Sequence, residues 1–117
     1  PMKTLSGKAG EEHIAHWLEE RGYRIVARNF HSRFGEIDII AQREPYIAFV
    51  EVKTRAKNSL VSPFEAITPK KRQKLIATAK FFLLNHPTQL QPRFDAAAVY
   101  LQGEEIVGEE YLENVFV

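Results

Sequence analysis

The sequence contains no cysteine, which excludes disulfide bonds and thiolate metal sites. No apolar run approaches the roughly 20 residues that a membrane-spanning helix needs, and no signal-peptide pattern opens the chain. We therefore expect a cytoplasmic protein with no membrane partner. The formal net charge is only +1, so the total charge says little about possible partners.

Internal repeats, low-complexity segments and linkers are also missing, which favours a single domain over residues 1–117. A chain of 117 residues is long enough to enclose one hydrophobic core. The hydrophobic fraction of 44% is typical of a folded protein and argues against a disordered one.

Hydrophobic periodicity and turn residues predict an α/β fold, with helices packed on a mixed β-sheet. Gly22 suits the end of the first predicted helix, and Thr68-Pro69 supplies an N-cap and a first-turn proline for the second. A polar turn over 29–33 and a loop over 54–67 are expected, and the type of the final element, 104–117, stays open. The predicted order is helix, three strands, helix and strand, over residues 5–21, 23–28, 34–40, 49–53, 69–86 and 93–101.

The two middle strands carry charges where strands usually carry apolar residues. Because side chains alternate along a strand, Glu36 and Asp38 share one face of the first strand. Glu51 and Lys53 likewise share one face of the second. The turn-like cluster over residues 42–45 contains a proline and predicts the tip of a hairpin. This hairpin places Asp38 opposite Glu51. It also places Glu36 opposite Lys53.

Opposed side chains in a sheet have Cβ atoms roughly 4.5–5.5 Å apart, so the carboxylates of Asp38 and Glu51 would repel each other. A shared proton, a cation such as Lys53 or a divalent metal could offset this repulsion. We interpret the pair as a Mg²⁺ or Mn²⁺ site, with the backbone carbonyl of Val52 as a third ligand, because hard cations take carboxylate and carbonyl oxygens. Lys53 would orient the attacking hydroxide or stabilise the transition state of phosphodiester hydrolysis.

Glu11 is the third acid of the predicted site. It belongs to an i, i+3, i+4, i+7 stripe that predicts a position facing the sheet, where it could hold a metal-bound water or a second ion. Two simpler interpretations stay open. Glu11 could be a first-turn acid that the helix dipole favours. Lys53 could pair with Glu36 or Glu51 in a structural network on a solvated face.

Basic residues concentrate in the middle of the chain. Residues 53–80 contain eight lysines and arginines and one acid, Glu65, whereas residues 101–117 contain five glutamates and no base. A basic segment suits a polyanionic partner, although a solvated helix face gives the same pattern. Backbone N–H groups at the start of the second predicted helix also suit a phosphate. The candidate nucleic-acid contacts are Arg33, Arg55, Lys70, Lys71, Arg72 and Lys74.

Several segments together resemble the YraN family of bacterial proteins, which is similar to archaeal Holliday junction resolvases within the PD-(D/E)xK nuclease superfamily. The resemblance covers residues 4–100, and its most specific part is the ordered pair of motifs G-E-I-D and F-V-E-V-K-T-R. The matching segments are Gly7-Lys8-Ala9-Gly10-Glu11-Glu12, Gly22-Tyr23, Arg28-Asn29-Phe30, Gly35-Glu36-Ile37-Asp38, Phe49-Val50-Glu51-Val52-Lys53-Thr54-Arg55 and Arg93-Phe94-Asp95.

The resemblance implies a restriction-endonuclease-like fold with an α-β-β-β-α-β core and Mg²⁺-dependent cleavage of DNA. The superfamily's first-helix glutamate falls on Glu11 and its aspartate on Asp38. Its E-x-K pair falls on Glu51 and Lys53. The residue before the aspartate is Ile37 and not the proline of the superfamily's name, a position that is often replaced.

Asp95 also belongs to the family pattern, and it could hold Arg93 or Lys53 in place or simply border the site. By analogy with junction resolvases, which act as twofold dimers, a homodimer is implied. The leading hypothesis is a metal-dependent endonuclease acting on DNA, including branched or damaged forms. One alternative is a nucleic-acid-binding module that keeps the nuclease fold without turnover. A structural or adaptor protein is the other.

Overall fold

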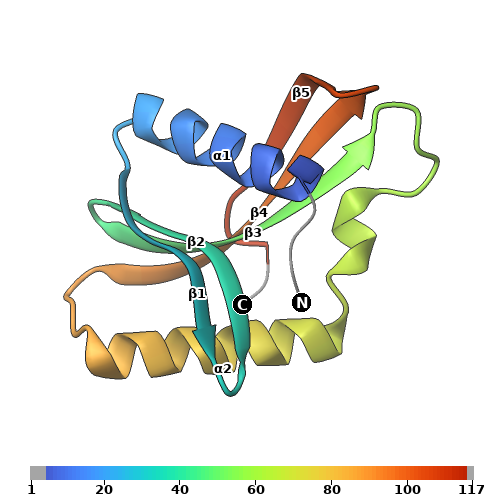
Figure 1. The fold of residues 1–117 in the computed structure, drawn as a ribbon. Coiled ribbons are helices and arrows are strands. Elements are labelled where there is room, and N and C mark those ends of the chain that lie inside the picture. The colour runs from blue at the N-terminus through green and yellow to red at the C-terminus, as the bar shows by residue number, and fades with distance from the viewer. Residues whose placement is uncertain (1–4, 116–117) are drawn as a thin grey trace.

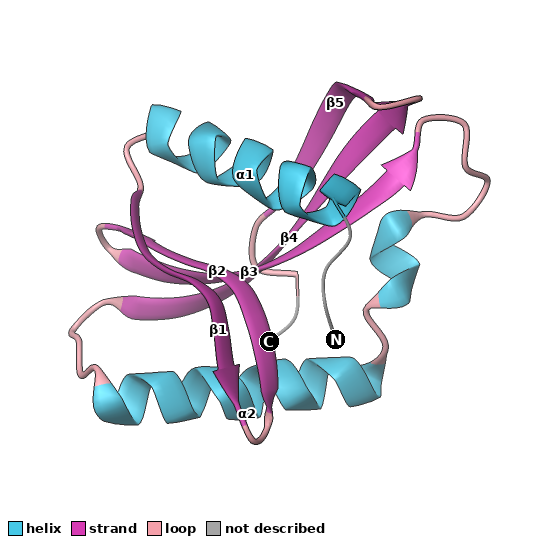
Figure 2. Cartoon of the chain, in the orientation of Figure 1, coloured by secondary structure: helices cyan, strands magenta, loops and turns pink. Residues whose placement is uncertain are grey.

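A five-stranded β-sheet carries one long helix on each of its faces (Figures 1 and 2). The computed structural model describes residues 5–115. The predicted α/β fold is confirmed, and the α-β-β-β-α-β order is extended by a fifth strand. In chain order the elements are α1 (Leu5–Glu20), β1 (Arg24–Ser32), β2 (Gly35–Arg43), β3 (Tyr46–Ala56), the 3₁₀ turn η1 (Pro63–Ala66), α2 (Pro69–Asn85), β4 (Gln91–Gln102) and β5 (Glu105–Leu112).

The strands lie in the sheet in the same order as in the chain. Strands β1 and β3 are each antiparallel to β2, β4 is parallel to β3, and β5 is antiparallel to β4. A parallel pair needs a crossover connection, because the chain must return to the end of the sheet where the first strand began. Here α2 makes that crossover and covers the face opposite α1 (Figure 1).

The sheet separates two hydrophobic cores. Neighbouring residues of a strand point to opposite faces, so Phe49 belongs to the core under α2 and Val50 to the core under α1. On the α2 side, the rings of Phe49 and Phe82 pack edge to face with centroids 6.2 Å apart. The site acids therefore lie on strands whose other residues are buried on both faces.

The second helix begins and ends where the sequence predicts. Thr68 is its N-cap, with Oγ1 accepting the backbone N–H of Lys71 at 3.3 Å, and Pro69 is the first helical residue. Its buried stripe includes Leu75, Ala79 and Phe82. Within residues 5–115, no helix is long and apolar enough to cross a bilayer.

The predicted β2–β3 hairpin is confirmed in its register. The ladder runs from the pair Arg43–Tyr46 to the pair Ile39–Val50, with the turn at Glu44-Pro45. Continued by one residue, this register would place Asp38 across from Glu51, and continued by three it would place Glu36 across from Lys53, but the ladder ends at Ile39–Val50, before both predicted pairs. Instead Glu36 lies opposite His31 in the β1–β2 ladder, with His31 Nδ1 3.3 Å from Glu36 Oε2.

Two segments predicted as loops are partly strand. The polar turn expected at 29–33 shrinks to Arg33 and Phe34, because β1 continues to Ser32 and pairs with β2 along that length. The loop expected at 54–67 starts later, because β3 pairs with β4 as far as Ala56. In both places cross-strand hydrogen bonding outweighs the local preference of polar residues for turns.

The final element, left open above, is the antiparallel edge strand β5. Its glutamates, Glu105 and Glu109 among them, put charge on this edge strand, where charged side chains discourage pairing with another chain. Residues 116 and 117 of the predicted element lie outside the described part of the chain.

Candidate functional site

The centre of the candidate site is the carboxylate pair at the open end of the β2–β3 hairpin. Asp38 is 5% exposed and Glu51 is 7% exposed. The backbone N–H of Val52 donates to Asp38 Oδ2 at 2.8 Å, so a side chain takes the place of a strand hydrogen bond just beyond the last ladder pair. This bond holds the Asp38 carboxylate against β3.

Two lysines reach the same oxygen of Glu51. Lys53 Nζ lies 3.2 Å and Lys71 Nζ 3.5 Å from Glu51 Oε1. Lys53 comes from the same strand two residues on, whereas Lys71 comes from the first turn of α2, which Thr68 caps. The site thus combines two acids and two amines in a largely buried position.

This crowding shifts the proton affinities of the group. Burial raises the pKa of Glu51, and the charge of Asp38 raises it further, while the two lysines oppose the rise. Burial lowers the pKa of Lys53, Lys71 lowers it further, and Glu51 opposes the fall. An acid with a raised pKa beside an amine with a lowered pKa is typical of a site that handles protons or cations.

The donor oxygens fit a hard divalent cation. Magnesium in proteins commonly uses one or two carboxylates and completes its shell with water and substrate phosphate. Asp38 and Glu51 supply two such carboxylates, and the two ammonium groups at Glu51 Oε1 show that this oxygen already attracts positive charge. A ligand role for the carbonyl of Val52 stays a prediction.

Glu11 is buried against the sheet, as its stripe predicts, and is 3% exposed. The close approach of α1 depends on Gly10, because a Cβ at that position would meet Thr54 Oγ1 at 2.3 Å. Glu11 is the seventh residue of α1, beyond the first turn in which the helix dipole acts, so the dipole interpretation does not explain it.

The structure does not, however, gather all three acids around one point. Within residues 5–115, no group of three or more acidic or histidine side chains is placed to hold a single metal ion. Glu11 comes from α1, whereas Lys71 of α2 contacts Glu51, and these helices cover opposite faces of the sheet (Figure 1). A contribution of Glu11 through a metal-bound water stays a prediction.

The predicted nucleic-acid contacts divide into three places. Lys70, Arg72 and Lys74 are exposed at the start of α2, Arg55 is half-buried near the end of β3, and Arg33 is exposed at the tip of the β1–β2 hairpin. At the start of α2, Thr68 takes up the N–H groups of Lys71 and Arg72, and Pro69 has none. Two of the N–H groups near this end are therefore used within the helix, and a role for the remaining backbone N–H of Lys70 toward phosphate stays a prediction.

Lys71 is one of the predicted phosphate contacts, and its ammonium also lies beside Glu51, which the sequence does not predict. Local pattern indicates that Lys71 belongs to the first turn of a capped helix. The docking of that turn over β3 is a tertiary feature without a signal in the sequence.

Asp95 lies at the centre of a second buried charge cluster. Of the two candidate partners, Arg93 and Lys53, it is Arg93 that contacts it. Asp95 is 0% exposed and accepts hydrogen bonds from Arg93 Nη2 at 2.9 Å, from the hydroxyl of Tyr111 at 2.6 Å and from the backbone N–H of Asn114 at 2.9 Å. Burial raises the pKa of Tyr111, and the charge of Asp95 raises it further. Asp95 pairs with Val50 in the parallel ladder, one residue from Glu51, so this cluster belongs to the α1 side of the sheet.

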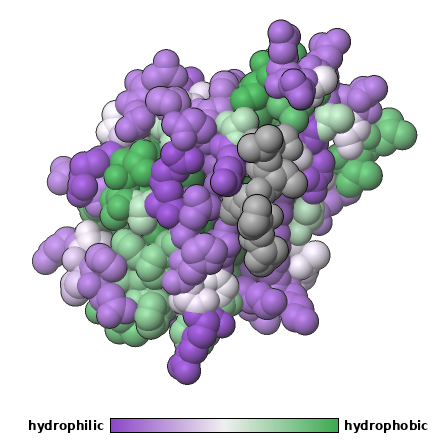
Figure 3. All heavy atoms as spheres, viewed as in Figure 1, coloured by the Kyte–Doolittle hydropathy of each residue, from purple (hydrophilic) through white to green (hydrophobic). Residues whose placement is uncertain are grey.

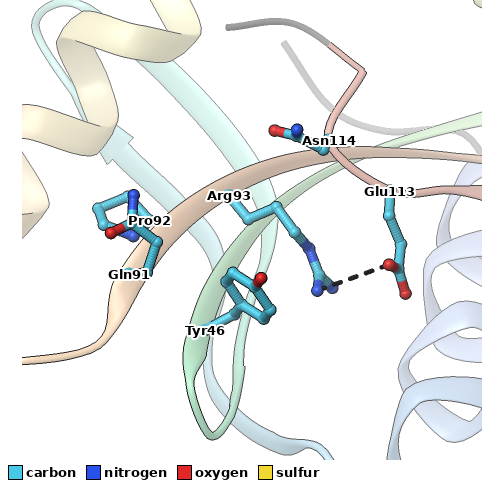
Figure 4. A pocket seen from close by; sticks show the side chains of 6 residues that line it. All are labelled: Tyr46, Gln91, Pro92, Arg93, Glu113 and Asn114. Atoms are coloured by element: carbon cyan, nitrogen blue, oxygen red, sulfur yellow. Dashed lines mark ion pairs between the residues drawn. The ribbon is translucent and has the colours of Figure 1, made fainter.

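Arg93 also lines a hollow of about 480 Å³ at the surface (Figure 4). Its guanidinium lies above the ring of Tyr46, 4.8 Å from the ring centroid, and Nη1 lies 3.8 Å from Glu113 Oε1. With Asp95 on one side and Glu113 on the other, the arginine is neutralised by the protein itself. The hollow is therefore part of the packing of the C-terminal segment and separate from the acid pair.

Comparison with known proteins identifies relatives along most of the chain. The family model described as "Uncharacterised protein family UPF0102" matches residues 10–99. A UPF0102 protein of Prosthecochloris aestuarii is 44% identical over 100 residues, covering 85% of this chain and 79% of the relative. A UPF0102 protein of Caldanaerobacter subterraneus subsp. tengcongensis is 39% identical over 117 residues, covering 97% of this chain and 96% of the relative.

Among solved structures, Pyrococcus furiosus SfsA in complex with Ca²⁺ is similar at a TM-score of 0.37 and 18% identity. The match covers 93% of this chain and 62% of that one. The family model and both relatives match most of the chain, including the motifs around Asp38 and Glu51. The chain therefore belongs to the UPF0102 family, which is the YraN family.

Proposed function

We propose that this protein is a metal-dependent endonuclease that hydrolyses phosphodiester bonds in DNA. The observation that supports the proposal best is the buried pair Asp38 and Glu51, with two lysine ammonium groups 3.2 and 3.5 Å from one Glu51 oxygen. A structural ion pair needs one acid and one amine, and each further buried charge adds a desolvation cost. Charge crowding of this kind occurs preferentially at functional sites.

The carboxylates of Asp38 and Glu51 would hold Mg²⁺ or Mn²⁺, with Val52 as a backbone ligand and Glu11 acting through water. When bound, such an ion supplies a water of lowered pKa and neutralises charge on the phosphodiester. The N–H of Val52 fixes the orientation of Asp38, so one of the two metal-binding groups is held in place before any ion arrives.

Lys53 would orient the attacking water and stabilise the charge that develops on the phosphate. Its lowered pKa makes proton exchange with a water molecule easier than for an exposed lysine. Lys71 sets the electrostatic balance at Glu51 from the first turn of α2, since its ammonium lies beside the same oxygen.

The exposed cations at the start of α2 would contact the DNA backbone next to the site. Lys70 and Arg72 flank Lys71 in sequence, and Lys74 follows on the next turn. Contacts to phosphate position a duplex without reading its sequence, so this arrangement suits an enzyme that recognises DNA structure. Arg33 and Arg55 would add contacts farther from the acid pair.

The test is a nuclease assay of the purified protein on linear, flapped and four-way DNA with Mg²⁺ or Mn²⁺. We expect cleavage that Glu51→Ala and Lys53→Ala both abolish, while Lys57→Ala, which removes an exposed lysine just beyond the site, retains activity. Circular dichroism of each variant checks that the fold is kept. Cleavage that persists in both site variants would contradict the proposal.

A second candidate is a DNA-binding module without turnover. It is favoured by the finding that Glu11 does not form a three-acid cluster with Asp38 and Glu51 within residues 5–115. DNA binding that falls steeply with salt, without cleavage of any substrate, would support this candidate. A homodimer, which would present two sites to the two strands of a junction, is measured by sedimentation.

A further inference from the structure

A small apolar recess lies between the tip of the β1–β2 hairpin and the outer side of α2. Its volume is about 320 Å³, near the lower end of the range of small-molecule pockets, which suits one flat ring system better than an extended peptide. Figure 3 shows hydrophobic residues gathered on the part of this face where Figure 1 places β1 and the C-terminal half of α2. The residues that line the recess are Arg33, Phe34, Ala77, Lys80, Phe81 and Leu84.

Aromatic rings stand exposed in this recess. Phe34 is 37% exposed and Phe81 is 39% exposed, so more than a third of the surface of each residue is open to a ligand. Their ring centroids are 6.1 Å apart and the rings are tilted by 58°. The guanidinium of Arg33 lies over one face of the Phe34 ring, and the tilted Phe81 ring does not cover the rest, so a further flat group can stack against the exposed part.

The hairpin tip is held firmly against α2. Gly35 has a φ of +151°, and a Cβ at this position would lie 3.2 Å from Thr78 Oγ1 and 3.5 Å from the Cβ of Lys74. The backbone N–H of Phe34 also donates to Ser32 Oγ at 3.0 Å. The close approach and this hydrogen bond fix the position of Phe34, which lowers the entropy cost of binding a ligand against its ring.

The charge at the rim is positive. The guanidinium of Arg33 lies 4.8 Å from the centroid of the Phe34 ring, Lys80 borders the other side, and none of the six lining residues is acidic. Aromatic faces next to cations are the usual platform for unpaired nucleic-acid bases, because the ring stacks on the base and the cation meets the phosphate. A docked apolar helix would not require these cations.

We propose that this recess binds an unpaired nucleotide of the DNA substrate, with its base against Phe34 and Phe81 and its phosphate near Arg33 and Lys80. The inference rests on the proposed nuclease function and adds the substrate class: DNA with a single-stranded segment next to the cleaved strand.

The distance to the acid pair fits this assignment. Phe34 precedes Asp38 by four residues of β2, roughly 13 Å along an extended strand. Lys80 follows Lys71 by nine residues of α2, about 14 Å along a helix. At about 3.4 Å per nucleotide of a stacked strand, the recess lies roughly four nucleotides from the acid pair.

The test measures binding in EDTA, so it does not depend on cleavage. Two fluorescent DNAs of equal length are compared, one a blunt duplex and one a duplex with a short single-stranded overhang that contains 2-aminopurine. We expect the wild type to bind the overhang DNA roughly tenfold more tightly and to quench the 2-aminopurine by stacking. Phe34→Ala and Phe81→Ala should remove both effects and leave the binding of blunt duplex unchanged.

Controls separate stacking from other causes. Leu60→Ala, which removes an apolar side chain that is 101% exposed elsewhere on the surface, should bind both DNAs like the wild type. Phe34→Leu, which keeps an apolar side chain and so guards against misfolding, should lose the quenching. Arg33→Gln should weaken the binding of overhang DNA and reduce its salt dependence by about one phosphate contact.

Several results would overturn the inference. Equal binding of blunt and overhang DNA by the wild type would do so, as would a preference that survives in both phenylalanine variants. A dimer in sedimentation that Phe34→Ala dissociates would assign the recess to a second copy of this chain. None of these results touches the proposed hydrolysis, which is read from cleavage with metal. Loss of cleavage with the overhang preference intact would instead contradict only the nuclease function.

Discussion

Lys71 Nζ lies 3.5 Å from Glu51 Oε1, which joins the first turn of α2 to the central strand β3 at the candidate site. Without this contact, Glu51 would have Lys53 as its neighbouring cation on β3 and Asp38 as its neighbouring acid on β2. The second ammonium lowers the pKa of a buried carboxylate that burial and Asp38 otherwise raise. The position of α2 on the sheet therefore affects the pKa of Glu51.

Removing this cation should move the pH dependence of cleavage. In Lys71→Met the pKa of Glu51 should rise further, so a larger fraction of the carboxylate is protonated and unable to hold a metal at neutral pH. We expect the acid limb of the pH–rate profile to shift to higher pH and the neutral-pH rate to fall roughly tenfold. Lys70→Met, an exposed neighbour on the same turn, is the matched control. Identical profiles for the two variants would show that Lys71 does not act on Glu51.

Two substitutions of Asp38 should separate its charge from its hydrogen bond. Asp38→Asn keeps an oxygen that can accept the N–H of Val52 and removes the charge that repels Glu51, so the free energy of unfolding should stay level or rise. Asp38→Ala leaves that buried N–H unsatisfied and should cost about 1–3 kcal/mol. Urea unfolding measures both. Equal stabilities would indicate that the hydrogen bond contributes nothing.

The raised pKa of Glu51 predicts a loss of stability as the pH rises. The folded protein holds this proton at pH values where the unfolded chain, with an ordinary value of 4.5, has released it. The free energy of unfolding should therefore decrease as the pH rises from 4.5 through the raised pKa of folded Glu51. Glu51→Gln should lack this decrease, so the difference between the two unfolding curves isolates it. A difference that does not vary with pH would contradict the assignment.

The Asp95 cluster should matter for stability more than for chemistry. Asp95→Ala leaves Arg93, 5% exposed, as a buried charge without its main partner, and we expect a loss of about 3–5 kcal/mol in the free energy of unfolding. Glu113→Ala removes a carboxylate that is 58% exposed and 3.8 Å from Arg93, and should cost less than about 0.5 kcal/mol. The comparison is made by denaturant unfolding. A loss of similar size in both variants would show that the inner pair is not the dominant one.

Local rules were sufficient for the hairpin and for the start of α2. Counting from the turn at Glu44-Pro45 predicts the register of the ladder as far as Ile39–Val50, because strand register is set by the turn and by the alternation of side chains. Thr68-Pro69 marks the helix start because the cap and the fixed φ of proline act within a few residues. The same counting brings Asp38 and Glu51, the proposed metal ligands, to the same end of the hairpin.

The remaining features depend on contacts that are distant in sequence. Lys71 contacts Glu51 only when α2 is docked on the sheet. Asp95 pairs with Arg93 in a cluster that Tyr111 and Asn114, from the C-terminal segment, complete with two further hydrogen bonds to Asp95. The polar residues at the end of β1 predict a turn from their local sequence, but β2 supplies the hydrogen bonds that hold them in a strand. No window of sequence contains these partners together.

The central claim, that Asp38 and Glu51 together hold a divalent cation, is tested most directly by titrating Mn²⁺ into the purified protein and following the loss of free Mn²⁺ by electron paramagnetic resonance. We predict saturable binding by the wild type, weakened roughly a hundredfold or more in both Asp38→Asn and Glu51→Gln, and unchanged in Glu65→Gln, an exposed acid outside the site. Binding that is equal in all four proteins would contradict the account.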